Sequence, residues 1–214
     1  MIKLYICEND SALSKELWDI LLSSLPANMH GKINRLRRWP DRQASLAGKL
    51  LLRHALVTQF GSDRLLQLMQ LTEYNRPFLP MDGDFNISHT DGLIVCAFST
   101  TGPVGVDVEL KKPIKIQEFQ RVFTKREWAE LLSSSDQENL FFKLWTTKEA
   151  VMKADGRGMY LDPAGFDGQE QSIKIEEKLW YVQPLMLKSK WAGHICSHSK
   201  SDLQYQYLSF NDLV

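Results

Sequence analysis

Two observations about the sequence predict an α+β fold. Several segments carry residues that start and stop helices, and short runs of β-branched and aromatic residues cluster in the middle of the chain. The chain has 214 residues, which is enough for one large domain or two small ones. Its hydrophobic fraction of 43% is sufficient for a buried core.

The helix signals are local and specific. Asp41 can cap a helix that runs from about residue 42 to residue 60, where Gly61 would end it. The capping box Thr124–Glu127 predicts a short helix through residue 132. A second box, Ser135–Glu138, predicts a longer helix that ends near Asp155. Another short helix is expected over residues 18–25.

The strand signals form two groups. The N-terminal run 1–7 reads as a first strand, and three β-rich runs separated by turn residues predict an antiparallel meander over 85–89, 93–98 and 104–109. Four later runs predict a second small sheet, over 172–175, 180–183, 193–197 and 204–208. Segment 92–99 weakly repeats at 192–199, with only the Cys and the final Ser identical, which suggests two similar halves.

Composition excludes several classes of protein. Lys plus Arg and Asp plus Glu each number 26, so the net charge is zero and no global field favours nucleic acid or a membrane surface. The longest apolar run is far below the roughly 20 residues of a membrane helix. Cys7, Cys96 and Cys196 give no CxxC pair or disulfide framework, which favours a reducing, cytoplasmic location.

Two acids stand two residues apart in a predicted strand. Asp107 and Glu109 would therefore lie on one face, while Val106 and Val108 enter a core on the other. Two buried carboxylates repel each other unless a cation lies between them, and Mg²⁺ prefers such oxygen ligands. An exposed edge strand with solvated acids would show the same pattern.

A second candidate group lies on the longer helix. Glu149 and Lys153 are four residues apart, so they share a face, at the edge of an apolar arc beside Trp145. This position predicts the rim of a cleft, although an ordinary surface ion pair would look alike.

Basic residues gather upstream. Seven basic residues and one acid lie between Lys32 and Arg53, and Arg42, Lys49 and Arg53 fall within ~20° of one line on the predicted helix. Such a stripe can hold phosphates, and it can equally be a solvated helix face. Arg76–Pro77 and Ser88–His89 add a guanidinium, a hydroxyl and an imidazole nearby in the sequence.

Several of these blocks resemble one family, the 4′-phosphopantetheinyl transferases, and fit best its larger surfactin-synthetase-activating type. The matching blocks are Leu46–Arg53, Asn75–Pro77, Asn86–His89, Gly105–Glu109, Trp145–Lys153 and Ala154–Gly158. The resemblance spans roughly residues 40–160. Asn75 replaces a usual Gly, which Asn tolerates because it enters the left-handed region more readily than most residues.

The resemblance implies a fold and a reaction. It implies two similar α+β halves related by a pseudo-twofold axis, residues 1–103 and 104–214, each a small antiparallel sheet packed with helices, with the active site in the cleft between them. It implies an enzyme of the holo-[acyl-carrier-protein] synthase type. Such an enzyme moves phosphopantetheine from coenzyme A to a serine of an acyl, peptidyl or aryl carrier protein and releases 3′,5′-ADP. A monomer that binds neither nucleic acid nor membrane is expected.

The resemblance also implies residue roles. Asp107, Glu109 and Glu149 would bind Mg²⁺, Glu149 would also be the general base, and Lys153 would stabilise the charge on the pyrophosphate of coenzyme A. The contacts with coenzyme A would come from Asp107 and Lys153 and from six further residues: Arg42, Arg53, Arg76, Pro77, Ser88 and His89. Arg38 and Arg35 are alternatives to Arg42.

The sequence leaves other interpretations open. The chain could be an inactive relative that binds coenzyme A or a carrier protein, or a metal-dependent phosphate-ester hydrolase. His194, Cys196 and His198 alternate on a predicted strand, but their spacing is not that of a standard zinc site. Five apolar residues between the halves could dock the carrier or belong to the core: Ile114, Ile116, Phe119, Val122 and Phe123.

Overall fold

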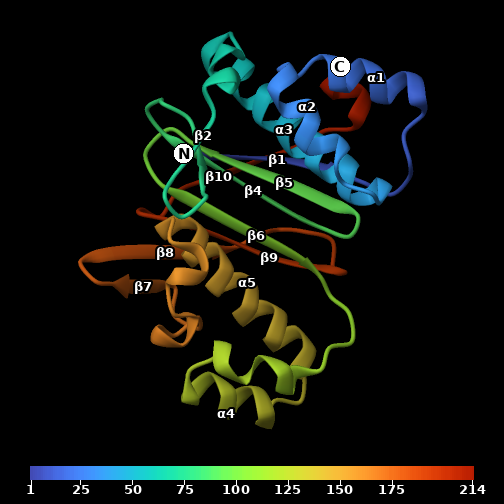
Figure 1. The fold of residues 1–214 in the computed structure, drawn as a ribbon. Helices are drawn as coiled ribbons and strands as arrows, with labels where there is room; N and C mark the ends of the chain where they lie inside the picture. Colours follow the sequence, from blue (N-terminus) through green and yellow to red (C-terminus); the bar gives the residue numbers. More distant parts are fainter.

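The computed structural model describes residues 1–214 and confirms the α+β class. Two four-stranded sheets lie against each other, and helices cover the outer face of each (Figure 1). The first sheet has the strand order β10-β1-β5-β4, and the second has the order β6-β9-β8-β7. The apolar layer between the sheets includes Ile2 and Leu4 from one side and Val106 and Val108 from the other.

The elements have these bounds. The helices are α1 Lys15–Ser23, α2 Ala27–Asn34, α3 Trp39–Phe60, α4 Lys125–Ser133 and α5 Gln137–Asp155. The strands are β1 Ile2–Glu8, β2 Gln70–Leu71, β3 Pro77–Phe78, β4 Asp84–Thr90, β5 Leu93–Ser99, β6 Val104–Leu110, β7 Ser172–Ile175, β8 Lys178–Pro184, β9 Trp191–Ser197 and β10 Leu203–Tyr207. None of the helices is long and apolar enough to cross a membrane.

The helix predictions hold best where a capping signal is strong. The Thr124 capping box is present with both of its hydrogen bonds, and α5 ends at Gly156 in the left-handed region. The predicted cap Asp41 is wrong, because Arg38 is the N-cap of α3 and Pro40 fits its first turn. Asp136, not Ser135, caps α5.

One helix has no clear sequence signal. Helix α2 follows Pro26, which offers no side-chain cap, and it contains Gly31 in its interior. Met29 and Ile33 pack into the apolar core between the first sheet and α3, and this tertiary packing stabilises the helix instead.

Two sheet predictions are wrong. Strand β6 does not continue the β4–β5 meander; it pairs with β9 in the second sheet. Strand β10, expected in the second sheet, crosses back and pairs in parallel with β1. Both errors concern which strand is the partner, a property that strand periodicity does not contain.

The two sheets repeat the same ladder with a shift of one hundred residues. In β1 and β5, Leu4 pairs with Ala97 and Tyr5 with Cys96. In β6 and β9, Val104 pairs with Ser197 and Gly105 with Cys196. The weak sequence repeat therefore marks equivalent strands, and the chain consists of two similar halves.

A ladder of side chains joins the halves. The alternate β4 residues that face β6 each accept a hydrogen bond from a β6 backbone N–H twenty positions further on. The pairs are Asp84 with Val104 at 2.9 Å, Asn86 with Val106 at 2.9 Å, Ser88 with Val108 at 3.3 Å, and Thr90 with Leu110 at 2.9 Å. Because β6 is an edge strand, these N–H groups would otherwise lack partners.

Candidate active site

The candidate site begins where α5 lies on β6. A Cβ atom at Gly105 would overlap the carbonyl oxygen of Ala150, so only glycine allows this contact between helix and strand. Because strand residues alternate, Asp107 and Glu109 face the same side as Gly105, towards α5. The sequence prediction of a shared face is therefore confirmed.

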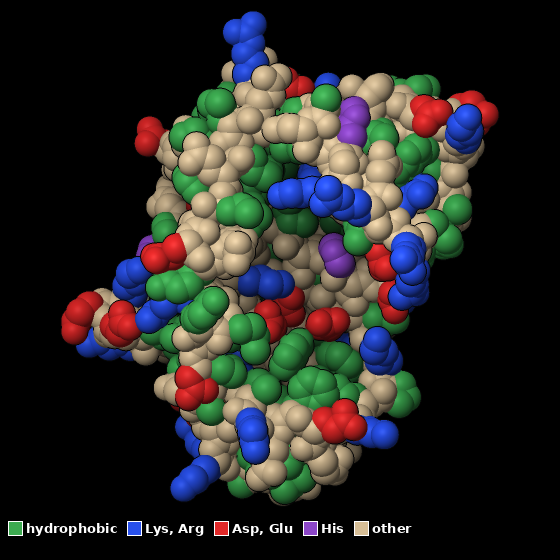
Figure 2. Space-filling view, viewed as in Figure 1, with side chains coloured by type: hydrophobic (Ala, Val, Ile, Leu, Met, Phe, Trp, Pro, Cys, Tyr) green, Lys and Arg blue, Asp and Glu red, His purple; other side chains and the backbone are tan.

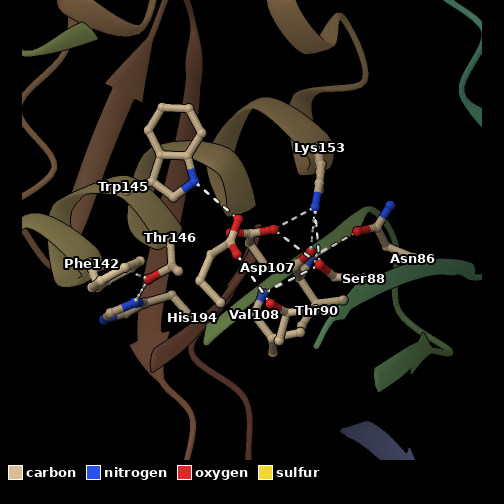
Figure 3. A network of polar contacts seen from close by, with 12 residues as sticks. Asn86, Ser88, Thr90, Asp107, Val108, Phe142, Trp145, Thr146, Lys153 and His194 are labelled. Atoms are coloured by element: carbon tan, nitrogen blue, oxygen red, sulfur yellow. Dashed lines mark hydrogen bonds and ion pairs between the residues drawn. The ribbon is translucent and has the colours of Figure 1, made fainter. Parts of the chain in front are cut away.

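Asp107 is the most buried acid of the group, at 4% exposure. Its Oδ1 accepts hydrogen bonds from Lys153 Nζ at 2.6 Å and from Ser88 Oγ at 3.0 Å (Figure 3). Its Oδ2 is buried and has no hydrogen-bond partner. A buried carboxylate oxygen without a donor has a free electron pair for a cation.

Glu109 lies one strand repeat further along β6. Its Oε1 accepts from Trp145 Nε1 and its Oε2 from Thr90 Oγ1, both at 3.3 Å. Trp145 is on α5 and Thr90 is on β4, so both halves orient this carboxylate. Neither contact was anticipated from the sequence, since each joins residues that are distant along the chain.

Glu149 and Lys153 share a face of α5, as the four-residue spacing predicts. Lys153 donates to Asp107 Oδ1, to Ser88 Oγ at 3.3 Å and to the carbonyl of Val106 at 3.3 Å. The Glu149 carboxylate makes no hydrogen bond and is half-buried. It is thus the acid of the group that is most available to accept a proton.

Burial raises the pKa of all three acids. For Asp107 the attraction of Lys153 opposes this effect, and for Glu109 the charge of Asp107 adds to it. For Glu149 burial is again the main cause; Lys153 lowers its pKa, and Asp107 and Glu109 raise it. The three carboxylates are therefore close enough to repel one another.

The residues fit a divalent cation, although no three acidic or metal-binding side chains already converge on one point. The donor set consists of hard carboxylate oxygens, the Asp107 Oδ2 is buried without a partner, and repulsion among the acids disfavours their charged forms. The oxygens that already accept a hydrogen bond keep a second lone pair for a metal.

His89 is exposed beside the site, in a cavity of about 210 Å³ that also touches Thr90, Asp41 and Lys112. Figure 2 shows a hollow across the middle of the molecule, with basic side chains on the side of the N-terminal half and acidic side chains on the opposite side. Ser88 is buried and bonded to Asp107, so its hydroxyl belongs to the carboxylate network.

The predicted arginines are not brought together. Arg76 forms a two-bond ion pair with Asp84, at 3.0 and 2.5 Å, and donates to the carbonyls of Lys153 and Val104, so it ties the halves together. Arg53 pairs with Asp63 at 2.8 Å. Arg42 stacks on Trp18 with a separation of 4.8 Å.

Unlike the arginines, two lysines lie close together. Lys32 and Lys49 border a cavity of about 290 Å³ that Pro77 and Asn86 also line. Burial lowers the pKa of Lys49, and the charge of Lys32 lowers it further, so the two amines are near each other. Lys49 was part of the basic stripe, but Lys32, on α2, has no periodic relation to it.

Most of the remaining candidate side chains pack against other parts of the protein. Ile116 and Phe123 are buried in the core against α4 and α5, and the other three apolar residues of that segment pack partly buried on the same core: Ile114, Phe119 and Val122. Cys196 is buried among apolar side chains, and His198 stacks on Trp180 at 4.0 Å. Asn75 has φ = 62°, so the left-handed conformation expected there is confirmed.

Comparison with known proteins identifies the family. Residues 103–202 match the 4′-phosphopantetheinyl transferase superfamily, and residues 12–101 match the 4′-phosphopantetheinyl transferase N-terminal family. The 4′-phosphopantetheinyl transferase Sfp of Bacillus subtilis is 31% identical over 182 residues, which cover 82% of this chain and 81% of that protein. The gsp transferase of Aneurinibacillus migulanus is 32% identical over 202 residues, which cover 92% and 85%.

A relative that matches a smaller part of the chain is the L-aminoadipate-semialdehyde dehydrogenase-phosphopantetheinyl transferase of Schizosaccharomyces pombe. It is 32% identical over 143 residues, which cover 58% of this chain and 55% of that protein. The chain belongs to the 4′-phosphopantetheinyl transferase superfamily, and it is similar to the Sfp-like members.

Proposed function

We propose that the chain transfers the 4′-phosphopantetheine group of coenzyme A to a serine of an apo carrier protein. The observation that carries this function is the meeting of Glu149 and Lys153 of α5 with Asp107 and Glu109 of β6 at the junction of the halves. A serine O–H gives its proton to Glu149, its oxygen bonds to the phosphorus that bears the pantetheine, and the bond from that phosphorus to the leaving 3′,5′-ADP breaks.

Glu149 suits the role of base because its carboxylate has no hydrogen bond and its pKa is raised. Lys153 suits the pyrophosphate because its ammonium lies within the same group of acids. Asp107, Glu109 and Glu149 would hold Mg²⁺, which when bound would neutralise charge on the phosphates. Ser88 and Thr90 would keep Asp107 and Glu109 oriented from the other half.

Mg²⁺ is expected to raise the unfolding temperature of the substrate-free protein, because it relieves the repulsion among the three acids. At one hundred times its dissociation constant, a single bound ion stabilises the folded state by about 2.7 kcal/mol. Thermal unfolding is measured in MgCl₂ and in NaCl of equal ionic strength. Asp107→Asn should lose the effect and Asp82→Asn, at an exposed acid outside the site, should retain it. An equal response of all three proteins would contradict the metal site.

For coenzyme A, we propose that Lys32 and Lys49 bind its 3′-phosphate and that the cavity they border, which Pro77 also lines, holds the adenosine. The contacts predicted for Ser88 and His89, which do not line this cavity, remain predictions. The roles predicted for Arg42, Arg53 and Arg76 remain predictions, and their pairing with Trp18, Asp63 and Asp84 leaves them less available. The two lysine amines have no acidic partner, which supports their role with an anion.

Lys49→Ala is expected to raise the KM for coenzyme A about tenfold or more with little change in kcat, because a charge-assisted hydrogen bond remote from the reacting phosphorus contributes ~1.5–3 kcal/mol to binding. Dephospho-coenzyme A, which lacks the 3′-phosphate, should show no such loss. Lys15→Ala, at an exposed lysine of α1, is the control. A similar loss with both substrates would exclude the 3′-phosphate as the partner.

The activity itself is tested by incubating the protein with coenzyme A, Mg²⁺ and apo acyl, peptidyl and aryl carrier proteins. A gain of one phosphopantetheine group in the mass of a carrier supports the proposal. If coenzyme A is bound but no carrier gains mass, the chain is an inactive relative. Release of phosphate from coenzyme A without a carrier would favour a hydrolase.

The division into residues 1–103 and 104–214 is also proposed, with the return of β10 to the first sheet as an exchange between halves. The two family matches, which meet at residues 101–103, support it. A monomer in the cytoplasm is proposed as well, and three buried cysteines without a disulfide fit a reducing compartment.

A further inference from the structure

A cavity of about 420 Å³ lies in the C-terminal half. Helix α5 lines it with Asn139, Lys143 and Thr147, which are four residues apart and so lie along one side of the helix. Thr147 and Glu149 differ by about 200° around the helix axis. The cavity and the transfer site therefore lie on opposite flanks of α5.

His194 forms part of the cavity wall and is 8% exposed. Its Nδ1 is 2.7 Å from the hydroxyl of Thr146, and that hydroxyl is 2.7 Å from the carbonyl oxygen of Phe142. A carbonyl only accepts, so the threonine proton goes to Phe142 and the threonine oxygen accepts from Nδ1–H. The proton of the neutral ring is therefore on Nδ1, and Nε2 has a lone pair.

The imidazole Nε2 makes no hydrogen bond with the protein. In Figure 3 the His194 ring meets Thr146 on one edge and points away from the network around Asp107. Burial lowers the pKa of His194 to about 4, and the charge of Lys143 adds to this effect, so the ring is neutral at pH 7. His194 Nε2 is not among the buried polar atoms that lack a partner, so it reaches the cavity and is free to accept a hydrogen bond from a molecule there.

The charges around the cavity favour an anion. Lys111 and Lys143 line it, and neither amine forms an ion pair or a hydrogen bond. The one acid of the lining, Glu170, lies 3.7 Å from Arg126, which also pairs with Asp167 at 3.2 Å. Lys111 and Lys143 outnumber this acid, so the lining combines a net positive charge with one neutral acceptor.

We propose that this cavity binds a small anion that carries an O–H group, such as hydrogenphosphate or a hydroxycarboxylate. The O–H donates to His194 Nε2, and the negative charge lies near Lys111 and Lys143. Sulfate resembles phosphate in shape but has no proton at neutral pH, so it would place an oxygen lone pair against the lone pair of Nε2. The site is distinct from the coenzyme A cavity and does not depend on the transfer reaction.

Isothermal titration calorimetry at pH 7.5 tests the proposal, with coenzyme A and Mg²⁺ absent and ionic strength held constant. Phosphate is compared with sulfate, and malate is compared with succinate, which lacks the hydroxyl. We expect saturable one-to-one binding of phosphate, malate or both. Sulfate should bind at least about tenfold more weakly than phosphate, and succinate than malate, because each lacks the O–H group and so loses one hydrogen bond. Binding of phosphate alone identifies an oxyanion site, and binding of malate alone identifies a hydroxycarboxylate site.

Variants separate this cavity from the other basic cavity. Lys143→Ala, an exposed position where folding is not at risk, and His194→Leu should each weaken binding about tenfold or more. Lys49→Ala, in the coenzyme A cavity, should leave this binding unchanged. In ¹⁵N-labelled protein, the Nε2 resonance of His194 should be that of an unprotonated nitrogen and should shift on titration with the bound anion.

Four results would each overturn the proposal. The first is an absence of saturable binding by all four anions. The second is equal affinity for sulfate and phosphate together with equal affinity for succinate and malate. The third is full binding by Lys143→Ala, and the fourth is a His194 ring with its proton on Nε2.

Discussion

Glu149→Gln is expected to lower the rate of phosphopantetheine transfer by a factor of about 10²–10⁴, the usual contribution of a positioned general base. The amide keeps the size of the side chain, so the fold and the coenzyme A cavity should persist. The rate is measured as carrier mass gained per minute at saturating coenzyme A. Glu138→Gln, at an exposed glutamate of the same helix, is the matched control. Full activity in Glu149→Gln would refute the assignment.

The raised pKa of Glu149 predicts the pH dependence of the wild-type rate. Burial and the neighbouring acids favour the protonated carboxyl, which cannot accept the serine proton. The rate should therefore rise with pH through a range above that of an ordinary glutamate. Bound Mg²⁺ would favour the charged form and move this rise to lower pH. Glu149→Gln should lose this part of the profile.

Lys148→Met is expected to lower the free energy of unfolding by about 3–5 kcal/mol, the usual effect of leaving one partner of a buried ion pair alone. Lys148 and Glu127 are both fully buried, with their charged atoms 2.9 Å apart. The Lys148 amine also donates to the carbonyls of Pro163 and Phe166, both at 2.7 Å. Glu127 accepts from the N–H groups of Thr124 and Gly168 at the same distance.

Urea unfolding measures this loss, and a double variant identifies its cause. In Glu127→Gln with Lys148→Met no charge remains buried, so the double variant should be more stable than the sum of the single losses predicts. Lys115→Met, in the exposed pair of Lys115 and Glu118, should leave stability nearly unchanged. Additive losses would mean that an unpaired buried charge is not the main cause of the loss in unfolding free energy.

Local signals were sufficient for a large part of the fold. The Thr124 box, the end of α5 at Gly156 and the alternation in β6 were predicted because each depends on residues within a few positions of one another. The repeat around Cys96 and Cys196 was visible because equivalent strands kept two identical residues. Helix α2 was missed because tertiary packing, not its own residues, stabilises it.

The candidate site also contains residues that local spacing indicates and contacts that it does not. The sequence indicated Asp107, Glu109, Glu149 and Lys153, since strand and helix spacing shows which side chains share a face. It did not indicate Thr90 and Trp145 as partners of Glu109, or Lys32 as a neighbour of Lys49. Those contacts join separate elements, and no local period specifies them.

By itself, the sequence indicated the acids, the helix that carries Glu149 and Lys153, and the similarity of the halves. The tertiary structure decided which surfaces meet. It set β6 against β4 rather than in the meander, returned β10 to the first sheet and turned Arg76 into a link between the halves. The reason is physical: short-range periodicity fixes the direction of a side chain within its element, whereas burial of the shared apolar layer and pairing of edge N–H groups select its partner.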